Sequence, residues 1–257
     1  MKESKFTIIK DIQEIYDWLK KMNLCKEPKS IEKAISNCKS NSTNDYYDYR
    51  VSELEIDICD VFGGSIPNDV IVDKVVFSIS IRGKYFDEKC LFDPVFQEIN
   101  KKKHENFEYE FNIEVYGHKK IEDIWIDYYS SWHLDKHLEK EGDGENKFYH
   151  PLYHLTFGGK NMEKKADIYG QTLILPSPRI AHPPMDAILG IDFIIQNYVR
   201  IDIHKKMTSN PDYKRLLMRS QNRLWRPYYA AIGEHWNKTY STLDKNLEKQ
   251  KLIPNLQ

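Results

Sequence analysis

Four histidines are the residues best placed to do chemistry together, because the sequence predicts that they share one face of a β-hairpin. Two segments, 131–137 and 150–157, alternate polar and apolar residues with a period of two. A polar, glycine-containing stretch, 141–145, lies between them and is typical of a chain reversal. The face opposite the histidines would carry apolar residues that suit a core-facing surface, namely Trp132, Leu134, Tyr153, Leu155 and Phe157.

The expected turn would bring imidazoles together across the hairpin. A reversal near the middle of that stretch pairs His137 with His150. It also pairs His133 with His154 and leaves Asp135 between the two pairs. Because Cβ atoms of directly opposed residues lie about 4.5–5.5 Å apart, His133, His154 and Asp135 could ligate a divalent metal such as Zn or Mn.

The same spacing also suits catalysis without a metal. One neutral imidazole would act as base and one imidazolium as acid, as cleavage of a phosphodiester through a ribose 2′-hydroxyl requires. The candidate catalytic set is then His133, Asp135, His137, His150 and His154. The third interpretation is a solvent-facing strand surface on which histidine is merely polar.

Two cationic residues near this hairpin could bind a phosphate. Lys160 follows Gly158 and Gly159, whose backbone N–H groups can contact an anion, although paired glycines more often form a simple turn. Arg179 lies in the proline-rich loop 176–184, which is stiff because each proline fixes its own φ, and which leads into a predicted helix. The alternative is that Arg179 pairs with one of the many acidic residues.

A basic stripe near the C-terminus is a candidate surface for nucleic acid or a partner protein. Four arginines are spaced at intervals of four, four and three residues, so they share one helical face: Arg215, Arg219, Arg223 and Arg226. Tryptophan and tyrosine residues interleave with them. Such a stripe could contact phosphates while an aromatic ring stacks on a base, or it could anchor a protein partner. The alternative is a solvated face above aromatic side chains that pack in the core.

The composition describes a soluble globular protein without a general attraction to nucleic acid. The 257 residues are 40% hydrophobic and 30% charged, with a net charge of −1, so nucleic-acid binding would have to come from a local patch. No apolar run approaches the roughly 18 residues of a membrane span, and the N-terminus lacks the apolar core of a signal peptide. The scattered cysteines contain no C-x-x-C pair, which indicates reduced thiols. We therefore expect a cytoplasmic protein with no membrane partner.

The order of the predicted elements indicates an α+β fold. An amphipathic helix is expected over residues 7–24, and the polar stretch 36–44 is interpreted as a linker or exposed loop. Closely spaced segments with two-residue alternation follow, which favours an antiparallel sheet over βαβ units. These segments cover residues 54–58, 75–81, 107–115, 121–134, 148–157 and, as a short strand, 171–176.

The C-terminal part is expected to be helical. Pro184 can begin an almost wholly apolar helix that runs to about Arg200 and packs on the sheet. A last long helix would cover about 211–251, broken at Pro227. The chain is therefore predicted to be a single α+β domain with an antiparallel sheet of about six strands. Its parts are an N-terminal helical segment (1–45), the sheet (46–176) and the C-terminal helices (177–257).

Part of the chain resembles a bacterial protein family of unknown function. The resemblance rests on the run His150-Pro-Leu-Tyr-His-Leu-Thr-Phe-Gly-Gly159, on Leu175-Pro-Ser-Pro-Arg-Ile180 and on the apolar helix that follows. In that family a strand with an aspartate, here Trp132–Asp135, precedes a Pro-x-x-His-Leu-x-Phe strand and an Arg-Ile-Pro-like loop, whose final proline is replaced by Ala181. The resemblance spans about residues 130–200 and implies genes near toxin or phage-defence systems, but no established activity.

Two functions follow as hypotheses. The first is a histidine-dependent, phosphodiester hydrolase-like effector, for example an RNase, in a bacterial defence or toxin system, with Arg179 on the phosphate. The alternative is a non-catalytic subunit that binds a partner protein or nucleic acid in a multi-protein defence complex. An enzyme needs the histidines converged in a concave site with perturbed pKa values. A scaffold leaves them spread on an open strand face and exposes a large apolar patch elsewhere.

Overall fold

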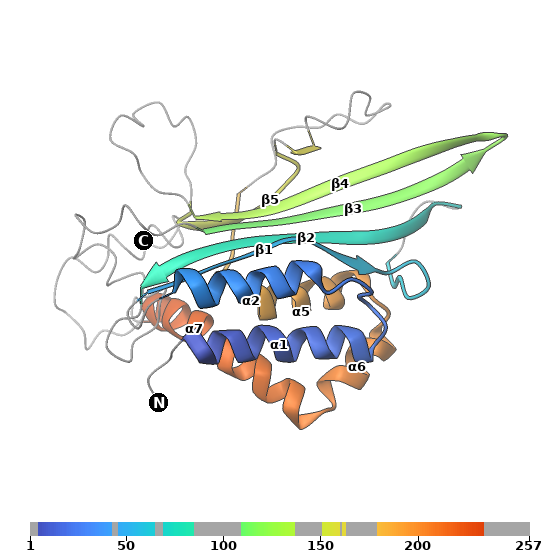
Figure 1. Cartoon of the computed structure of the whole chain (residues 1–257). Coiled ribbons are helices and arrows are strands. Elements are labelled where there is room, and N and C mark those ends of the chain that lie inside the picture. The colour runs from blue at the N-terminus through green and yellow to red at the C-terminus, as the bar shows by residue number, and fades with distance from the viewer. Residues whose placement is uncertain are drawn as a thin grey trace, which may run out of the picture.

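A six-stranded antiparallel sheet with helices on one of its faces confirms the predicted α+β class (Figure 1). The computed structural model describes residues 5–42, 46–64, 69–84, 109–136, 151–159, 161–162 and 179–233. The strands lie in the sheet in their order along the chain. They are β1 (Tyr46–Asp57), β2 (Ile71–Lys84), β3 (Tyr109–Ile121), β4 (Ile124–Lys136), β5 (Tyr153–Phe157) and β6 (Ile180–Ala181). The helices are α1 (Lys5–Lys21), α2 (Lys29–Asn41), α5 (Ala187–Tyr198), α6 (Ile201–Thr208) and α7 (Pro211–Gly233).

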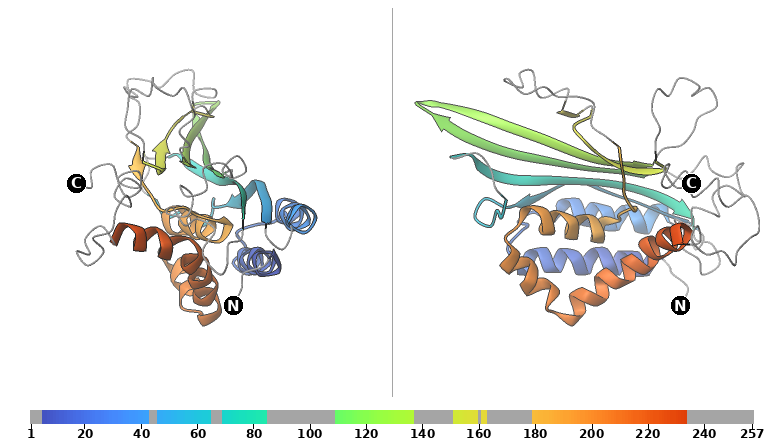
Figure 2. Two further views of the ribbon diagram at one scale, coloured as in Figure 1. Left: turned by 90° about the vertical axis from the view of Figure 1, so that its left-hand side faces the viewer. Right: turned by 180° about the vertical axis from the view of Figure 1, so that it is seen from behind.

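Alternation along the strands decides which face of the sheet meets the helices. In β2, Val75, Phe77 and Ile79 are at most 1% exposed, and Phe111 of β3 and Leu134 of β4 are fully buried on the same side. The helices lie beneath this face, and the hydrophobic core fills the space between the two layers (Figures 1 and 2). The opposite face of the sheet is called the outer face below.

The N-terminal region contains two helices rather than one helix and a loop. Residues 36–41 of the expected linker belong to α2. They are helical because Ile31, Ala34 and Cys38 recur on one side of the helix and are fully buried. This side packs against β1. Polarity alone was therefore a poor guide, since the polar residues of this stretch form the solvent-facing side of an amphipathic helix.

The C-terminal helices differ from the prediction at their ends. α5 begins after Asp186 rather than at Pro184, because the Asp186 carboxylate accepts hydrogen bonds from the N–H groups of Ile188 and Leu189, each at 3.0 Å. α6 was not predicted. α7 continues through Pro227 to Gly233, and the expected helical residues beyond that point lie outside the described ranges, as does the expected strand 171–176.

The hairpin of β3 and β4 extends past the helical layer as a two-stranded arm (Figures 1 and 2). We call residues 117–128 the β3–β4 arm. Its turn, Glu122–Asp123, falls within the segment 121–134 that we expected to be one strand. Glu122 adopts a left-handed backbone conformation, with φ of 55°, which lets the chain reverse between the paired residues Ile121 and Ile124.

Two further features of the described residues concern the helices and the cysteines. Every helix in the described ranges is too short or too polar to cross a bilayer. The described cysteines, Cys25, Cys38 and Cys59, are free thiols.

Candidate active site on the outer face of the sheet

The two halves of the predicted histidine hairpin, β4 and β5, pair antiparallel as expected, but their register is shifted by two residues. His133 lies opposite Thr156 instead of His154, and Asp135 is the residue that faces His154. A shift of two residues keeps every side chain on its own face, so the alternation pattern fits both registers equally well. The predicted turn 141–145 lies outside the described residues.

His133 and Asp135 form the closest pair among the predicted site residues. They are two residues apart on β4 and therefore share the outer face, where His133 Nε2 lies 3.1 Å from Asp135 Oδ2. Their side chains are 21% and 41% exposed. Burial raises the pKa of the Asp135 carboxyl above its ordinary value, while the interaction with the neighbouring His133 acts in the opposite direction.

Two β3 residues complete the polar surroundings of this pair. Glu110 lies opposite Asp135 and contributes to its raised pKa, since two neighbouring carboxylates repel each other. Asn112 lies opposite His133 and donates a hydrogen bond from Nδ2 to Glu110 Oε1, at 2.8 Å. The sequence shows that these residues point outward, but only the pairing of β3 with β4 reveals that they face His133 and Asp135.

The two glycines after β5 lie beside His133, and one of their two N–H groups is bonded within the sheet. Gly158 and Gly159 have φ of +87° and +80°. The N–H of Gly158 donates to Ser131 O at 2.7 Å, so it is already used within the sheet. At Gly159 a Cβ atom would stand 2.6 Å from Cε1 of His133, so the imidazole lies where any other residue would have its side chain. Lys160, the cation expected to assist, lies outside the described residues.

The other expected site residues are only partly joined to this pair. Arg179 acts on Asp135 electrostatically, in the direction opposite to the burial that raises its pKa, and its role on a phosphate stays a prediction. His154 is only 5% exposed, and its Nδ1 lies 3.1 Å from Pro151 O. His137 and His150 lie outside the described residues, so their part in the site stays a prediction.

The predicted metal site has no counterpart in the described part of the chain. There, no three side chains of His, Cys, Asp or Glu are grouped closely enough to hold a metal ion. His133 and Asp135 are adjacent, but the shifted register places His154 opposite Asp135 rather than opposite His133. Zn or Mn binding by His133, His154 and Asp135 therefore stays a prediction.

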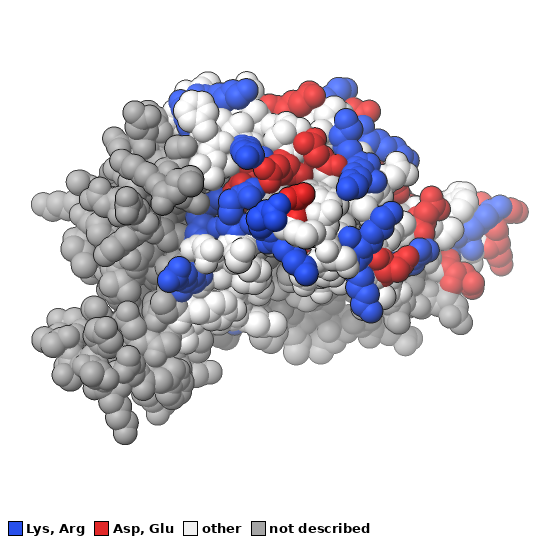
Figure 3. Space-filling view, turned by 90° about the horizontal axis from the view of Figure 1, so that it is seen from below, with Lys and Arg blue, Asp and Glu red and all other residues white. Residues whose placement is uncertain are grey.

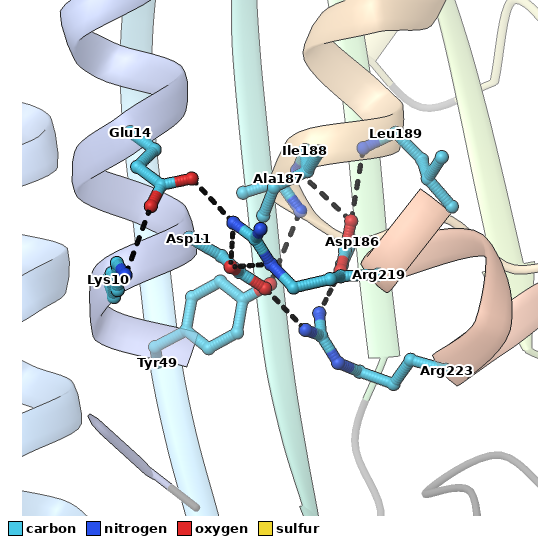
Figure 4. Close-up of polar contacts among 10 residues, drawn as sticks. All are labelled: Lys10, Asp11, Glu14, Tyr49, Asp186, Ala187, Ile188, Leu189, Arg219 and Arg223. Atoms are coloured by element: carbon cyan, nitrogen blue, oxygen red, sulfur yellow. Dashed lines mark hydrogen bonds and ion pairs between the residues drawn. The ribbon is translucent and has the colours of Figure 1, made fainter. Parts of the chain in front are cut away.

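The arginine stripe on α7 is largely committed to contacts inside the molecule (Figure 4). Arg223 is 5% exposed and donates to Asp11 Oδ2 at 2.5 Å and to Asp186 Oδ2 at 2.6 Å. Arg219 donates to Asp11 at 2.8 Å and to Glu14 at 2.5 Å. These two guanidinium groups bind α7 to α1 and to the start of α5, which removes them from the expected nucleic-acid or partner surface.

The remaining arginines do not make a continuous basic surface. Arg215 pairs with Asp212 one turn away, and Arg226 is exposed. Lysine and arginine are interspersed with aspartate and glutamate on the helical side of the molecule (Figure 3). A pocket of about 420 Å³ between α1 and α7 has the same mixed charge, since it is lined by Lys10, Glu14, Asp17, Trp18, Asp212, Arg215 and Arg219.

In comparisons with known proteins, no family model matches this chain, and neither a curated protein nor a solved structure is significantly similar to it. The family resemblance of residues 130–200 therefore finds no support from these comparisons. A role in bacterial defence or as a toxin, which rests on that resemblance, stays a prediction.

Proposed function

We propose that this chain is a histidine-dependent hydrolase of small phosphodiesters, with His133 as the proton-transferring residue. The observation that supports this most is the His133–Asp135 pair, 3.1 Å apart on the outer face, where the charge of Arg179 also acts on Asp135. A carboxylate that accepts from one imidazole nitrogen fixes the ring and stabilises its protonated form. Asp135 would hold Nε2–H, which leaves Nδ1 to take a proton from the attacking hydroxyl or give one to the leaving oxygen.

The charges of the described residues favour a small substrate over a long RNA. Arg179 can neutralise one phosphate beside the pair, whereas Glu110 and Asp135 would repel a second one nearby. Arg219 and Arg223, which could have extended a track for a phosphate backbone, are bound to carboxylates instead. A cyclic nucleotide or a dinucleotide presents one diester to the site and fits this arrangement.

The test is a hydrolysis assay with 2′,3′-cyclic nucleotides, dinucleotides and long RNA, each with and without EDTA. We expect cleavage of the small diesters in EDTA, and a fall in kcat of about 10²–10⁴ in His133→Ala. His118→Ala is the matched control, because His118 also lies on the outer face and pairs with a carboxylate, Asp73, at 2.6 Å. Equal loss in both variants, or none in His133→Ala, would contradict the proposal, and activity that EDTA abolishes would favour the metal mechanism.

The second candidate function is that of a non-catalytic subunit. The observation that favours it is the β3–β4 arm, on which five large hydrophobic side chains are between 39% and 68% exposed. Such a protein would hydrolyse none of the substrates. Its assembly with other molecules would be unchanged in His133→Ala and impaired by polar substitutions on the arm.

A further inference from the structure

The β3–β4 arm exposes apolar side chains on both of its faces. Outside the arm, β3 and β4 lie over the helices on one side of the sheet. No described helix reaches the arm itself (Figures 1 and 2). Its exposed hydrophobic residues are Ile121, Ile124, Trp125, Ile126 and Tyr128. Soluble monomers rarely expose apolar patches of this kind, and such patches usually mark an interaction site.

β4 also has an edge with available hydrogen-bonding groups. β5 pairs with β4 only from Trp132 to Lys136, so no described strand pairs with this edge between Ile124 and Ser131. The carbonyl of Ser131 points to this edge, because it accepts from Gly158 N. In an antiparallel ladder the direction alternates, so the N–H and C=O groups of residues 125 and 127 point the same way. An exposed strand edge of this kind is a template for another strand.

We propose that the β4 edge of the arm binds a second copy of the chain, strand against strand, around a two-fold axis at Ile126. This antiparallel arrangement places Ile126 opposite its own symmetry mate and Ile124 opposite Tyr128 of the partner copy. Trp125 of one copy and Asp127 of the partner copy exchange two backbone hydrogen bonds, and the two-fold axis repeats these bonds on its other side. The two sheets then become one continuous sheet across the axis.

The charges select this register among its neighbours. An axis at residue 127 places Asp127 opposite itself and brings the turn of one arm onto Trp132, whose edge is already paired with Phe157. An axis at residue 125 places Asp123 opposite Asp127. The axis at Ile126 avoids both of these direct oppositions. Each turn then lies next to the last residues of the other β4 before its pairing with β5 begins.

The same charges argue against a lipid surface as the occupant. The tip of the arm, residues 119–123, carries two lysines and two carboxylates, and the fully exposed Asp123 pairs with Lys120 at 3.5 Å. The tip therefore has no excess of positive charge, which is what attracts a protein segment to anionic lipid headgroups. Two copies of a chain with a net charge of only −1, in contrast, approach each other with little overall repulsion.

Sedimentation of the full chain tests the proposal. We expect a dimer whose population rises with concentration, and a monomer in Ile126→Lys, where two ammonium groups would face each other at the axis. Ile201→Lys is the control, because Ile201 is also an exposed isoleucine, at 68% against 39% for Ile126, but lies on α6. It should leave the dimer intact. A wild-type chain that stays monomeric, or a dimer that persists in Ile126→Lys, would overturn the proposal.

A cysteine scan tests the register independently of any effect on folding. Opposed residues that are not hydrogen-bonded to each other have Cα atoms about 4.5 Å apart, within reach of a disulfide. In a background with Cys59→Ser and Cys90→Ser, Ile126→Cys should form a covalent dimer on oxidation, whereas Ile124→Cys should not, since Tyr128 faces it. Equal cross-linking of the two variants would contradict the assigned axis.

Discussion

The imidazole of His133 lies directly against the backbone of Gly159, where a Cβ atom would stand 2.6 Å from Cε1 and 2.8 Å from Nδ1. The glycine thus creates the space that the histidine occupies. This relationship joins the end of β5 to the candidate proton-transferring residue on β4, and it can be tested without changing any group that would touch a substrate.

Gly159→Ala is expected to displace the His133 ring, because the new methyl group would clash with Cε1 of that ring. Hydrolysis of small diesters should fall as a result. The substitution should also cost about 1–3 kcal/mol of stability, since φ of +80° strains any residue with a Cβ atom. Gly158→Ala separates the displacement of the His133 ring from the backbone strain. It carries a similar φ of +87°, but its Cβ would meet only Met162 Sδ, at 3.6 Å. Equal activity in the two variants would contradict the positioning role.

Arg223→Met is expected to destabilise the fold severely, by about 3–5 kcal/mol, because it leaves the buried carboxylates of Asp11 and Asp186 without their shared cation. Urea unfolding measures the change. Arg215→Met is the control, because Arg215 is 59% exposed and pairs with Asp212 on the same helix. Its free energy of unfolding should change by less than about 1 kcal/mol. Similar losses in both variants would show that the buried network does not link the helices as described.

Lys136→Met is expected to change the stability of the protein more favourably at acidic pH than at alkaline pH. Burial lowers the pKa of Lys136 to about 7, whereas in the unfolded chain it is near 10.5. Between these values the unfolded state binds the extra proton, so the wild-type stability rises with pH and the cost of burying the ammonium disappears. Urea unfolding should therefore give a free-energy change on substitution that is more favourable at pH 6 than at pH 9.5. The same change at both values would contradict the lowered pKa.

Gly190→Ala is expected to destabilise the protein although alanine favours helix. Helix propensity would contribute about 1 kcal/mol in favour of alanine. The new Cβ, however, would lie 2.4 Å from Phe111 Cε2 and 2.7 Å from Phe77 Cε2, and such overpacking costs about 1–3 kcal/mol. Calorimetry should show a lower Tm. In a Phe111→Leu background the same substitution should cost less, and an unchanged cost there would assign the loss to something other than this contact.

Local periodicity determined most of the architecture from the sequence alone. Alternation in residues 75–81 and 107–115 predicted which side chains of β2 and β3 enter the core, and the structure buries Phe77, Phe111 and Ile113 accordingly. Period-two burial needs only the pleat of a strand, and the 3.6-residue repeat needs only the helix, so neither depends on distant parts of the chain. The same local rules placed His133 and Asp135 on one face of β4.

Tertiary structure decided which residues meet across the sheet and across the helical layer. The register that sets Asp135 opposite His154 preserves every side-chain face, so no local pattern distinguishes it from the register two residues away. Helical spacing gathered the arginines on one side of α7, but it carries no information on what that side contacts. Arg223 meets Asp11, 212 residues earlier in the chain, because the packing of α7 on α1 buries both charges and each needs the other.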